Sequence, residues 1–107
     1  FYTAEALAKA YGEAARIDIL DRFPVPYGLI RFGVAPDHQS LKAVSKRYDK
    51  VADEAGVDFI GNVTVGRDVS VAGLLDLYDA VVLATGAPHD RTLGIPGEDL
   101  PGVVGSA

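Results

Sequence analysis

The sequence predicts an α/β fold with a parallel sheet, and three observations support this prediction. Apolar residues recur at helical spacing over Thr3–Ala15 and again over Ser40–Ala55. Short strand-like stretches, Ile17–Leu20 and Val57–Ile60, follow these two helices. Ala80–Ala84 is apolar at every position, which is typical of a strand that is covered on both faces. Helix and strand patterns in alternation favour βαβ units.

The first predicted helix is rich in alanine, a strong helix former, and Gly12 weakens its end. It leads directly into Ile17–Leu20, as the second half of a βαβ unit does. Asp21 stands where that strand should end. In dinucleotide-binding folds, the acid that binds the ribose lies about 20 residues beyond the glycine-rich turn. Asp21 has this spacing if such a turn ends just before Phe1. The alternative, an acid that begins a turn, is equally compatible with its position.

A long apolar connection separates Asp21 from the helix expected at Ser40. Prolines fix their own φ and glycines permit positive φ, so we expect neither a helix nor an ordinary strand here. A plain α/β connection needs only about 2–6 residues, and longer ones are usually functional or disordered. This connection is too apolar for disorder, and either a flat cofactor ring or another domain could cover it. Its stiff and apolar residues are Phe23, Pro24, Val25, Pro26, Tyr27, Gly28, Leu29, Ile30, Phe32, Gly33 and Val34.

The second predicted helix carries lysines opposite its apolar stripe, and Gly56 is a natural stop for it. The lysines could form a docking patch for an acidic protein. Because aspartates lie among them, a solvated face of mixed charge is the favoured interpretation. The stripe is Leu41, Val44, Tyr48, Val51 and Ala55, and the lysines are Lys42, Lys46 and Lys50.

In the C-terminal half, Val69–Tyr78 could hold one or two turns of helix with Ser70 as its cap. The apolar run that follows ends in Thr85-Gly86, where glycine lets the backbone pass close to a ligand. Open α/β sheets bind ligands at this carboxyl end of the strands. The tail, 93–103, is expected to be a loop of turns because it contains two Pro-Gly pairs.

Composition excludes several classes of function. The 107 residues suffice for one domain at most, and 49% hydrophobic residues argue against disorder. A net charge of -5 disfavours nucleic acid as a partner. Without cysteine there is no disulfide or thiolate metal site, and His38 and His89 alone do not make a usual zinc site. No signal peptide and no apolar run of about 18 residues is present, so we expect no membrane span and a cytoplasmic location.

His38 could exchange a proton near a reacting cofactor, since its ordinary pKa lies near neutrality. A histidine that simply starts a helix is the favoured alternative. The chain begins inside a helical pattern without a cap, and Ser106 could cap a further helix at its end. We therefore expect residues 1–107 to be one partial domain that lacks both flanks.

Four stretches resemble a known family, the adrenodoxin-reductase-type ferredoxin–NADP reductases. The most specific is VPYGLIRFGVAPDH at 25–38. GNVTVG at 61–66, YDAVVLATGA at 78–87 and IPGEDLPG at 95–102 follow in the family's order and spacing. The last two also resemble the small subunit of glutamate synthase. The resemblance implies an α/β, partial Rossmann-like FAD-binding domain of the flavoprotein type with two dinucleotide-binding domains, without its first strand and its NADP domain.

The resemblance also implies the site residues. Asp21 matches the acid on the adenosine ribose, and Leu29, in the Tyr-Gly-Leu step that includes Gly28, matches a residue whose backbone meets FAD. Val65 matches the position on the adenine side, and Gly86 lies in the second glycine motif. His38 matches a histidine near the flavin and nicotinamide; catalytic residues are not identified. Asp21 replaces the commoner Glu, and Gln39 replaces a common Pro.

The implied function is FAD-dependent transfer of electrons from NADPH to a ferredoxin-like protein, with NADP(H) bound by a domain outside this chain. The parent would be an enzyme, a ferredoxin–NADP(+) reductase, and the fragment alone inactive. Two alternatives stay open: a flavin electron-delivery subunit similar to the glutamate synthase small subunit, and a non-catalytic nucleotide-binding fragment. A cysteine-rich segment upstream would favour the first of them.

Overall fold

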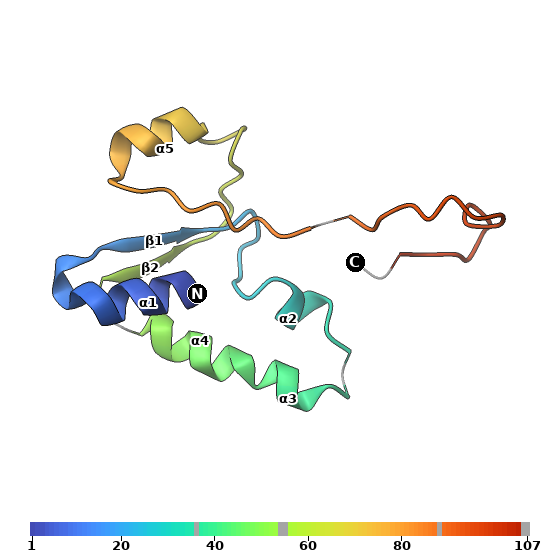
Figure 1. Ribbon diagram of the computed structural model, residues 1–107, viewed down its shortest axis with the longest axis horizontal. Coiled ribbons are helices and arrows are strands. Elements are labelled where there is room, and N and C mark those ends of the chain that lie inside the picture. Colours follow the sequence, from blue (N-terminus) through green and yellow to red (C-terminus); the bar gives the residue numbers. More distant parts are fainter. Residues whose placement is uncertain (36, 54–55, 88, 106–107) are drawn as a thin grey trace.

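The structure is a computed structural model that describes residues 1–35, 37–53, 56–87 and 89–105 (Figure 1). Its elements are α1 (Tyr2–Tyr11), a 3₁₀ turn η1 (Gly12–Ala14), β1 (Ile17–Leu20), α2 (Leu29–Phe32), α3 (Gln39–Lys42), α4 (Val44–Ala52), β2 (Val57–Ile60) and α5 (Val71–Leu77).

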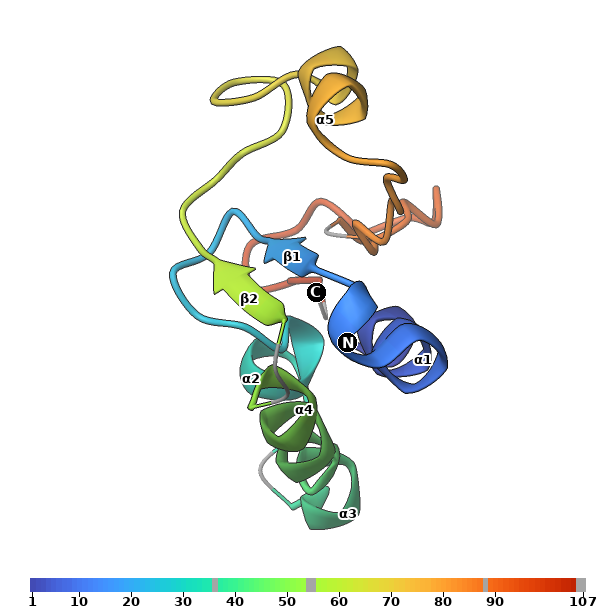
Figure 2. The ribbon, with the colours of Figure 1, turned by 90° about the vertical axis from the view of Figure 1, so that its left-hand side faces the viewer.

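The two strands pair in parallel, from Ile17 opposite Val57 to Leu20 opposite Ile60. Both were predicted with these bounds, and the helical connection between them makes a βαβ unit. Helices α1 and α4 lie on one side of the sheet and α5 lies on the other (Figures 1 and 2). The predicted α/β class is therefore confirmed.

A small core fills the space between α1, α4 and the sheet. It consists of Ala4, Val51 and Val57, each less than 9% exposed. Ile17 and Ile19 pack against this core, because alternate residues of a strand point to the same face. Side chains of Phe1 and Ala8 complete the layer.

An ion pair joins the two helices at the edge of the core. Arg47 of α4 donates from Nε and Nη2 to the Glu5 carboxylate of α1, with the shortest distance 2.7 Å. The same guanidinium lies 5.1 Å from the centre of the Tyr2 ring. Both charged groups are partly exposed, so this contact orients the helices more than it stabilises them.

The helix expected over Ser40–Ala55 is divided into α3 and α4 at Ala43. Ser45 Oγ donates to the Lys42 carbonyl oxygen at 2.8 Å, a local bond that competes with the helical pattern. The Lys46 amide correspondingly donates to the Ala43 carbonyl at 3.2 Å, three residues back. Ala55 and Ser106 lie outside the described residues.

The expectation that the apolar connection contains no helix was wrong. Gly28 adopts a φ of 46° and reverses the chain, and its carbonyl accepts from the amides of Arg31 and Phe32 at 3.0 Å each. These bonds begin the single turn α2, which ends when Gly33 donates to Leu29 at 2.8 Å. The glycines that argued against a helix, Gly28 and Gly33, instead stand at the two ends of α2.

The strand expected at Ala80–Ala84 is not formed in the described chain, where Val82 and Leu83 are 60% and 66% exposed. The segment lies beyond β1 on the side away from β2 (Figure 2). It is attached to the sheet at its start, where the Tyr78 hydroxyl donates to Asp18 of β1. A strand needs a neighbour to complete its ladder of hydrogen bonds, and the described residues provide none here.

Helix α5 confirms the prediction for Val69–Tyr78, including its cap. Ser70 Oγ accepts from the Gly73 amide at 3.0 Å. In the described ranges, no helix combines the length and the apolar character that a membrane span requires.

The chain buries little of its surface. Its accessible area is 8314 Å², whereas a folded monomer of this mass exposes about 5,700 Å². Its radius of gyration is 17.1 Å, against about 13 Å for a compact domain of this length. The described chain is therefore less compact than a monomer of this length, and large apolar side chains such as Leu77, Leu83 and Val104 are exposed on it.

The C-terminal loop is stapled by one carboxylate. Glu98 accepts from the amides of Leu93 and Gly94, both at 2.7 Å, and these bonds lower the pKa of Glu98 from its ordinary value of 4.5. Because the pKa in the folded protein is the lower one, these hydrogen bonds stabilise the loop above pH 4.5, and this stabilisation is lost as the pH falls through the folded pKa.

We expect amide exchange at 93–94 in the full-length protein to accelerate in acid relative to its intrinsic rate, and Glu98→Gln to show no such pH dependence.

Candidate functional site

The candidate site lies at the edge of the sheet where both parallel strands end. The pairing continues past the strands, since the Asp21 amide donates to Ile60 at 3.1 Å and the Val63 amide donates to Asp21 at 3.0 Å. Asn62, with a φ of 61°, donates from its amide to the Phe23 carbonyl at 3.2 Å. These bonds hold Asp21 and the turn after β2 side by side, at the end of the sheet where β1 and β2 stop (Figure 1).

Asp21 is half-buried, and its carboxylate begins a turn: Oδ1 accepts from the Phe23 amide at 3.0 Å. This is the second of the two interpretations that the sequence left open. It does not exclude the first, because a carboxylate has a second oxygen and further lone pairs. The hydrogen bond fixes the direction of the side chain at the strand end.

Gly61 allows the connection after Asp21 to cross the end of β2. A Cβ at this position would lie 2.8 Å from the Phe23 carbonyl oxygen and 3.0 Å from Pro24 Cα. Only glycine accommodates this approach of two backbones. Gly61 was not among the predicted site residues, although it lies in the GNVTVG stretch of the family resemblance.

The apolar connection keeps part of its surface open. The Phe23 and Phe32 rings lie 5.2 Å apart and cover each other in part. Leu29, however, is 62% exposed and Phe32 is 58% exposed. The described chain therefore leaves these side chains free to cover something else, as the sequence predicted.

Val65 and Gly86 lie in separate surroundings. Val65 is bridged to Val69 in a turn that Asp68 closes by accepting from the Thr64 amide at 2.8 Å. The hydrogen bonds that Asp68 accepts from the Arg67 side chain and the Thr64 amide lower the pKa of Asp68 to about 2. Gly86 has a φ of 68° and open space around it. Among the described residues, no hydrogen bond joins either position to Asp21, and their shared role as cofactor contacts stays a prediction.

His38 stands at the start of α3, where its carbonyl accepts from the amides of Leu41 and Lys42. Its side chain is exposed and makes no capping bond. This agrees with a histidine that starts a helix, and its proposed proximity to a flavin stays a prediction. His89 is exposed, as expected. No three His, Cys, Asp or Glu side chains in the described ranges gather in a way that could hold a metal ion.

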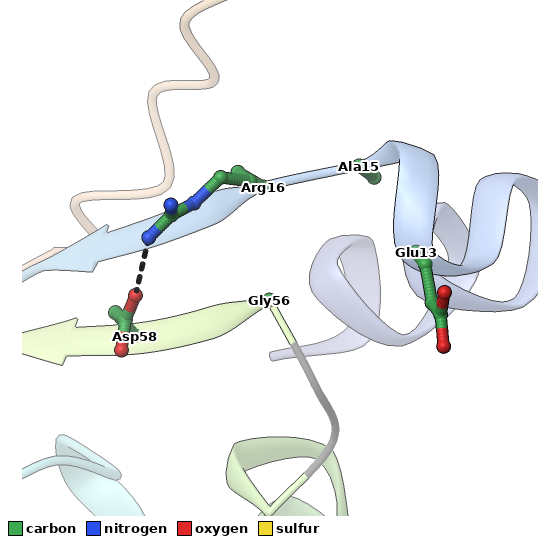
Figure 3. A pocket seen from close by; sticks show the side chains of 5 residues that line it. All are labelled: Glu13, Ala15, Arg16, Gly56 and Asp58. Atoms are coloured by element: carbon green, nitrogen blue, oxygen red, sulfur yellow. Dashed lines mark ion pairs between the residues drawn. The ribbon is translucent and has the colours of Figure 1, made fainter.

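Two of the hollows on the surface of the described residues are open to solvent. One, of about 420 Å³, lies where the strands begin and carries the Arg16–Asp58 ion pair of 3.7 Å (Figure 3). It is at the edge opposite to the one where parallel sheets bind ligands. The other, of about 330 Å³, is lined by Tyr27, Ile30, Arg31, Lys42, Ser45 and Asp49.

The structure also shows a long-range interaction beside the apolar connection that no sequence pattern indicated. The Tyr27 hydroxyl donates to Asp49 Oδ1, across 22 positions of the chain. Partial burial, followed by this bond, raises the pKa of Tyr27 to about 12. Asp49 belongs to the charged face of α4, where Lys46 and Lys50 are also exposed. The mixed charge of this face agrees with the solvated interpretation of the lysines, and a docking role is not tested.

Comparison with known proteins gives close relatives. No family model matches the chain. It is 52% identical over 103 residues to the mitochondrial NADPH:adrenodoxin oxidoreductase of Arabidopsis thaliana, covering 96% of this chain and 21% of that protein. It is 45% identical over 108 residues to NADPH-ferredoxin reductase FprA of Mycobacterium leprae, covering 97% of this chain and 24% of that protein.

Solved structures agree. The chain superposes on FprA of Mycobacterium tuberculosis, an oxidoreductase whose structure shows a covalent modification of NADP+, with a TM-score of 0.87 and 45% identity over 95% of this chain and 24% of that one. It matches FprA in complex with NADPH with a TM-score of 0.86, 45% identity and coverage of 95% and 23%. The resemblance expected from the sequence is confirmed, and the chain spans about a quarter of these relatives or less.

Proposed function

We propose that this chain, a homologue of one segment of the adrenodoxin-reductase-type ferredoxin–NADP reductases, is part of the FAD-binding domain of such an enzyme. The observation that carries the proposal is the identity of 45–52% to relatives named as NADPH-dependent reductases, over nearly the whole chain. Residues 1–107 then form a partial domain, and its first strand and the NADP domain belong to the rest of the parent protein.

The residues at the carboxyl edge fit the adenosine half of a dinucleotide. Asp21 is held at the end of β1 with one carboxylate oxygen in a turn, which leaves acceptor capacity for ribose hydroxyls. A Cβ added at Gly86 would meet no heavy atom within 4 Å, so the backbone there offers an open surface. Leu29 presents an exposed apolar side chain beyond Gly28. These residues would bind and orient the cofactor rather than transfer protons.

FAD, when bound, would supply the redox chemistry, hydride uptake from NADPH and single-electron transfer to a ferredoxin-like protein. In this chain, Asp21 would bind the ribose hydroxyls, and the apolar connection would cover part of the cofactor.

A further strand, supplied by the parent protein, would account for the unpaired Ala80–Ala84. Dinucleotide-binding sheets have the strand order 3-2-1-4, and β2 and β1 correspond to strands 3 and 2. Ala80–Ala84, beyond β1, then corresponds to strand 4 (Figure 2). We propose that a strand of the parent protein lies between β1 and Ala80–Ala84, and that it covers the exposed Val82 and Leu83.

The test uses the full-length parent protein. Purified protein is expected to be yellow, to contain FAD and to reduce a ferredoxin with NADPH. A colourless protein that takes up no added FAD and oxidises no NADPH would overturn the proposal. We also propose a cytoplasmic location. Because relatives from plants and animals are named as mitochondrial, imaging of the tagged parent protein with a mitochondrial marker decides between the two.

A further inference from the structure

Tyr27 adopts a backbone conformation that residues other than glycine rarely take. Its φ is 87°, and the next residue, Gly28, has a φ of 46°. Two successive positive φ values turn the chain sharply between the rigid Pro24–Pro26 segment and α2. A tyrosine keeps such a conformation only where its surroundings hold it there.

Contacts on three sides hold it. The Tyr27 ring lies 5.1 Å from the Phe1 ring and 5.7 Å from the Tyr48 ring, measured between centres. On another side, Arg31 lies 5.6 Å from the ring centre and donates from Nε to the Pro26 carbonyl at 3.2 Å. At the ring's far end, the hydroxyl donates to Asp49 of α4.

These contacts connect the apolar connection to the helical layer. Asp49 precedes by two positions Val51, the most deeply buried residue of the core. The Tyr27 carbonyl in turn accepts from the Ile30 amide at 3.0 Å, and the Gly28 carbonyl accepts from Arg31. The turn that presents Gly28 and Leu29 is therefore fixed to α4 through one side chain.

We propose that Tyr27 is a positioning residue, whose hydrogen bond to Asp49 holds the backbone of Gly28 and Leu29 in place for FAD. The inference rests on the proposed function, since it names what sets the geometry of that site. The Tyr27 hydroxyl can donate over the physiological range, because a phenol is protonated there, and partial burial together with the bond to Asp49 raises its pKa further, to about 12.

The experiment uses the full-length protein with Tyr27→Phe, which keeps the ring and removes the hydroxyl. Loss of one such bond is expected to raise the FAD dissociation constant about threefold to tenfold. The visible circular dichroism of the bound flavin should change with it. In the FAD-free protein, amide exchange over 27–31 should accelerate by a similar factor.

Tyr48→Phe is the matched control, because it keeps the ring that contacts Tyr27 and removes a hydroxyl whose hydrogen-bond partner is Tyr2, outside the connection. It should leave FAD affinity and exchange over 27–31 unchanged. Asp49→Ala should reproduce Tyr27→Phe, and the double variant should be no worse than either, because both remove the same bond.

The outcomes separate the two proposals. If wild-type protein binds no FAD, the proposed function fails and this inference falls with it, whatever the exchange data show. If wild-type protein binds FAD but Tyr27→Phe binds it equally well, only the inference is overturned. It is also overturned if Tyr27→Phe and Tyr48→Phe weaken FAD equally, which would indicate a general loss of packing.

Discussion

Replacing Gly56 with alanine is expected to destabilise the full-length protein by about 3 kcal/mol or more. Gly56 has a φ of 85°, and a Cβ there would lie 2.6 Å from the Ala15 carbonyl oxygen. The backbone at Gly56 cannot easily move away from Ala15, because the Gly56 carbonyl accepts from the Ile17 amide at 2.6 Å, where the pairing of β1 and β2 begins. The alanine therefore adds a strained conformation and a clash where β1 and β2 begin to pair.

Gly66→Ala is the control for this experiment. Gly66 has a φ of 96° but no heavy atom within 4 Å of an added Cβ, so alanine there adds conformational strain alone. We expect a cost of about 1–2 kcal/mol for it. Chemical denaturation of both variants measures the difference. A Gly56→Ala protein as stable as Gly66→Ala would show that the approach to Ala15 is relaxed without cost.

The sequence identified Gly56 as a helix stop but did not indicate this contact. Local patterns predict strand positions well. Strands β1 and β2 have the predicted bounds, because a short stretch of alternating apolar residues favours a strand. What Gly56 packs against depends on where the chain before β1 runs, which no local pattern describes.

The errors in the predicted fold have different origins, and two of them are local. The break at Ala43 follows from one hydroxyl, that of Ser45, which bonds backward to Lys42 although the apolar stripe continues. The turn of α2 follows from the φ of Gly28, a value that the glycine permits but does not require. Ala80–Ala84 has the pattern of a buried strand, yet pairing needs a neighbouring strand, and the described residues place none beside it.

The sequence predicted the positions of residues that directly follow a strand. It did not predict contacts between residues that are far apart in the sequence. Asp21 could be placed because it follows β1 directly. The bond between Tyr27 and Asp49 could not, because an apolar loop and a charged helix face carry no sign of each other in sequence. Family resemblance supplied the roles of Val65 and Gly86, and the geometry of the described chain leaves those roles as proposals.

Substitution of Asp21 is expected to cause the largest loss of cofactor binding, and two variants separate its two roles. Asp21→Asn keeps an oxygen that can accept from the Phe23 amide, so the turn survives while the negative charge is lost. A hydrogen bond to a charged group is worth about 1.5–3 kcal/mol, which corresponds to roughly tenfold to a hundredfold in affinity. We expect Asp21→Asn to bind FAD about tenfold more weakly, and Asp21→Ala, which loses the turn as well, to bind it more weakly still.

Titration of the FAD-free full-length protein with FAD measures these affinities, and Asp53→Asn is the control for the change of charge. Asp53 is exposed at the end of α4, so its neutralisation should leave FAD affinity unchanged. The decisive comparison is between the amide and alanine variants at position 21. Wild-type affinity in Asp21→Asn together with weak binding in Asp21→Ala would mean that the residue only builds the turn. The ribose would then be bound by another group, because a ribose-binding carboxylate depends on its charge and the turn does not.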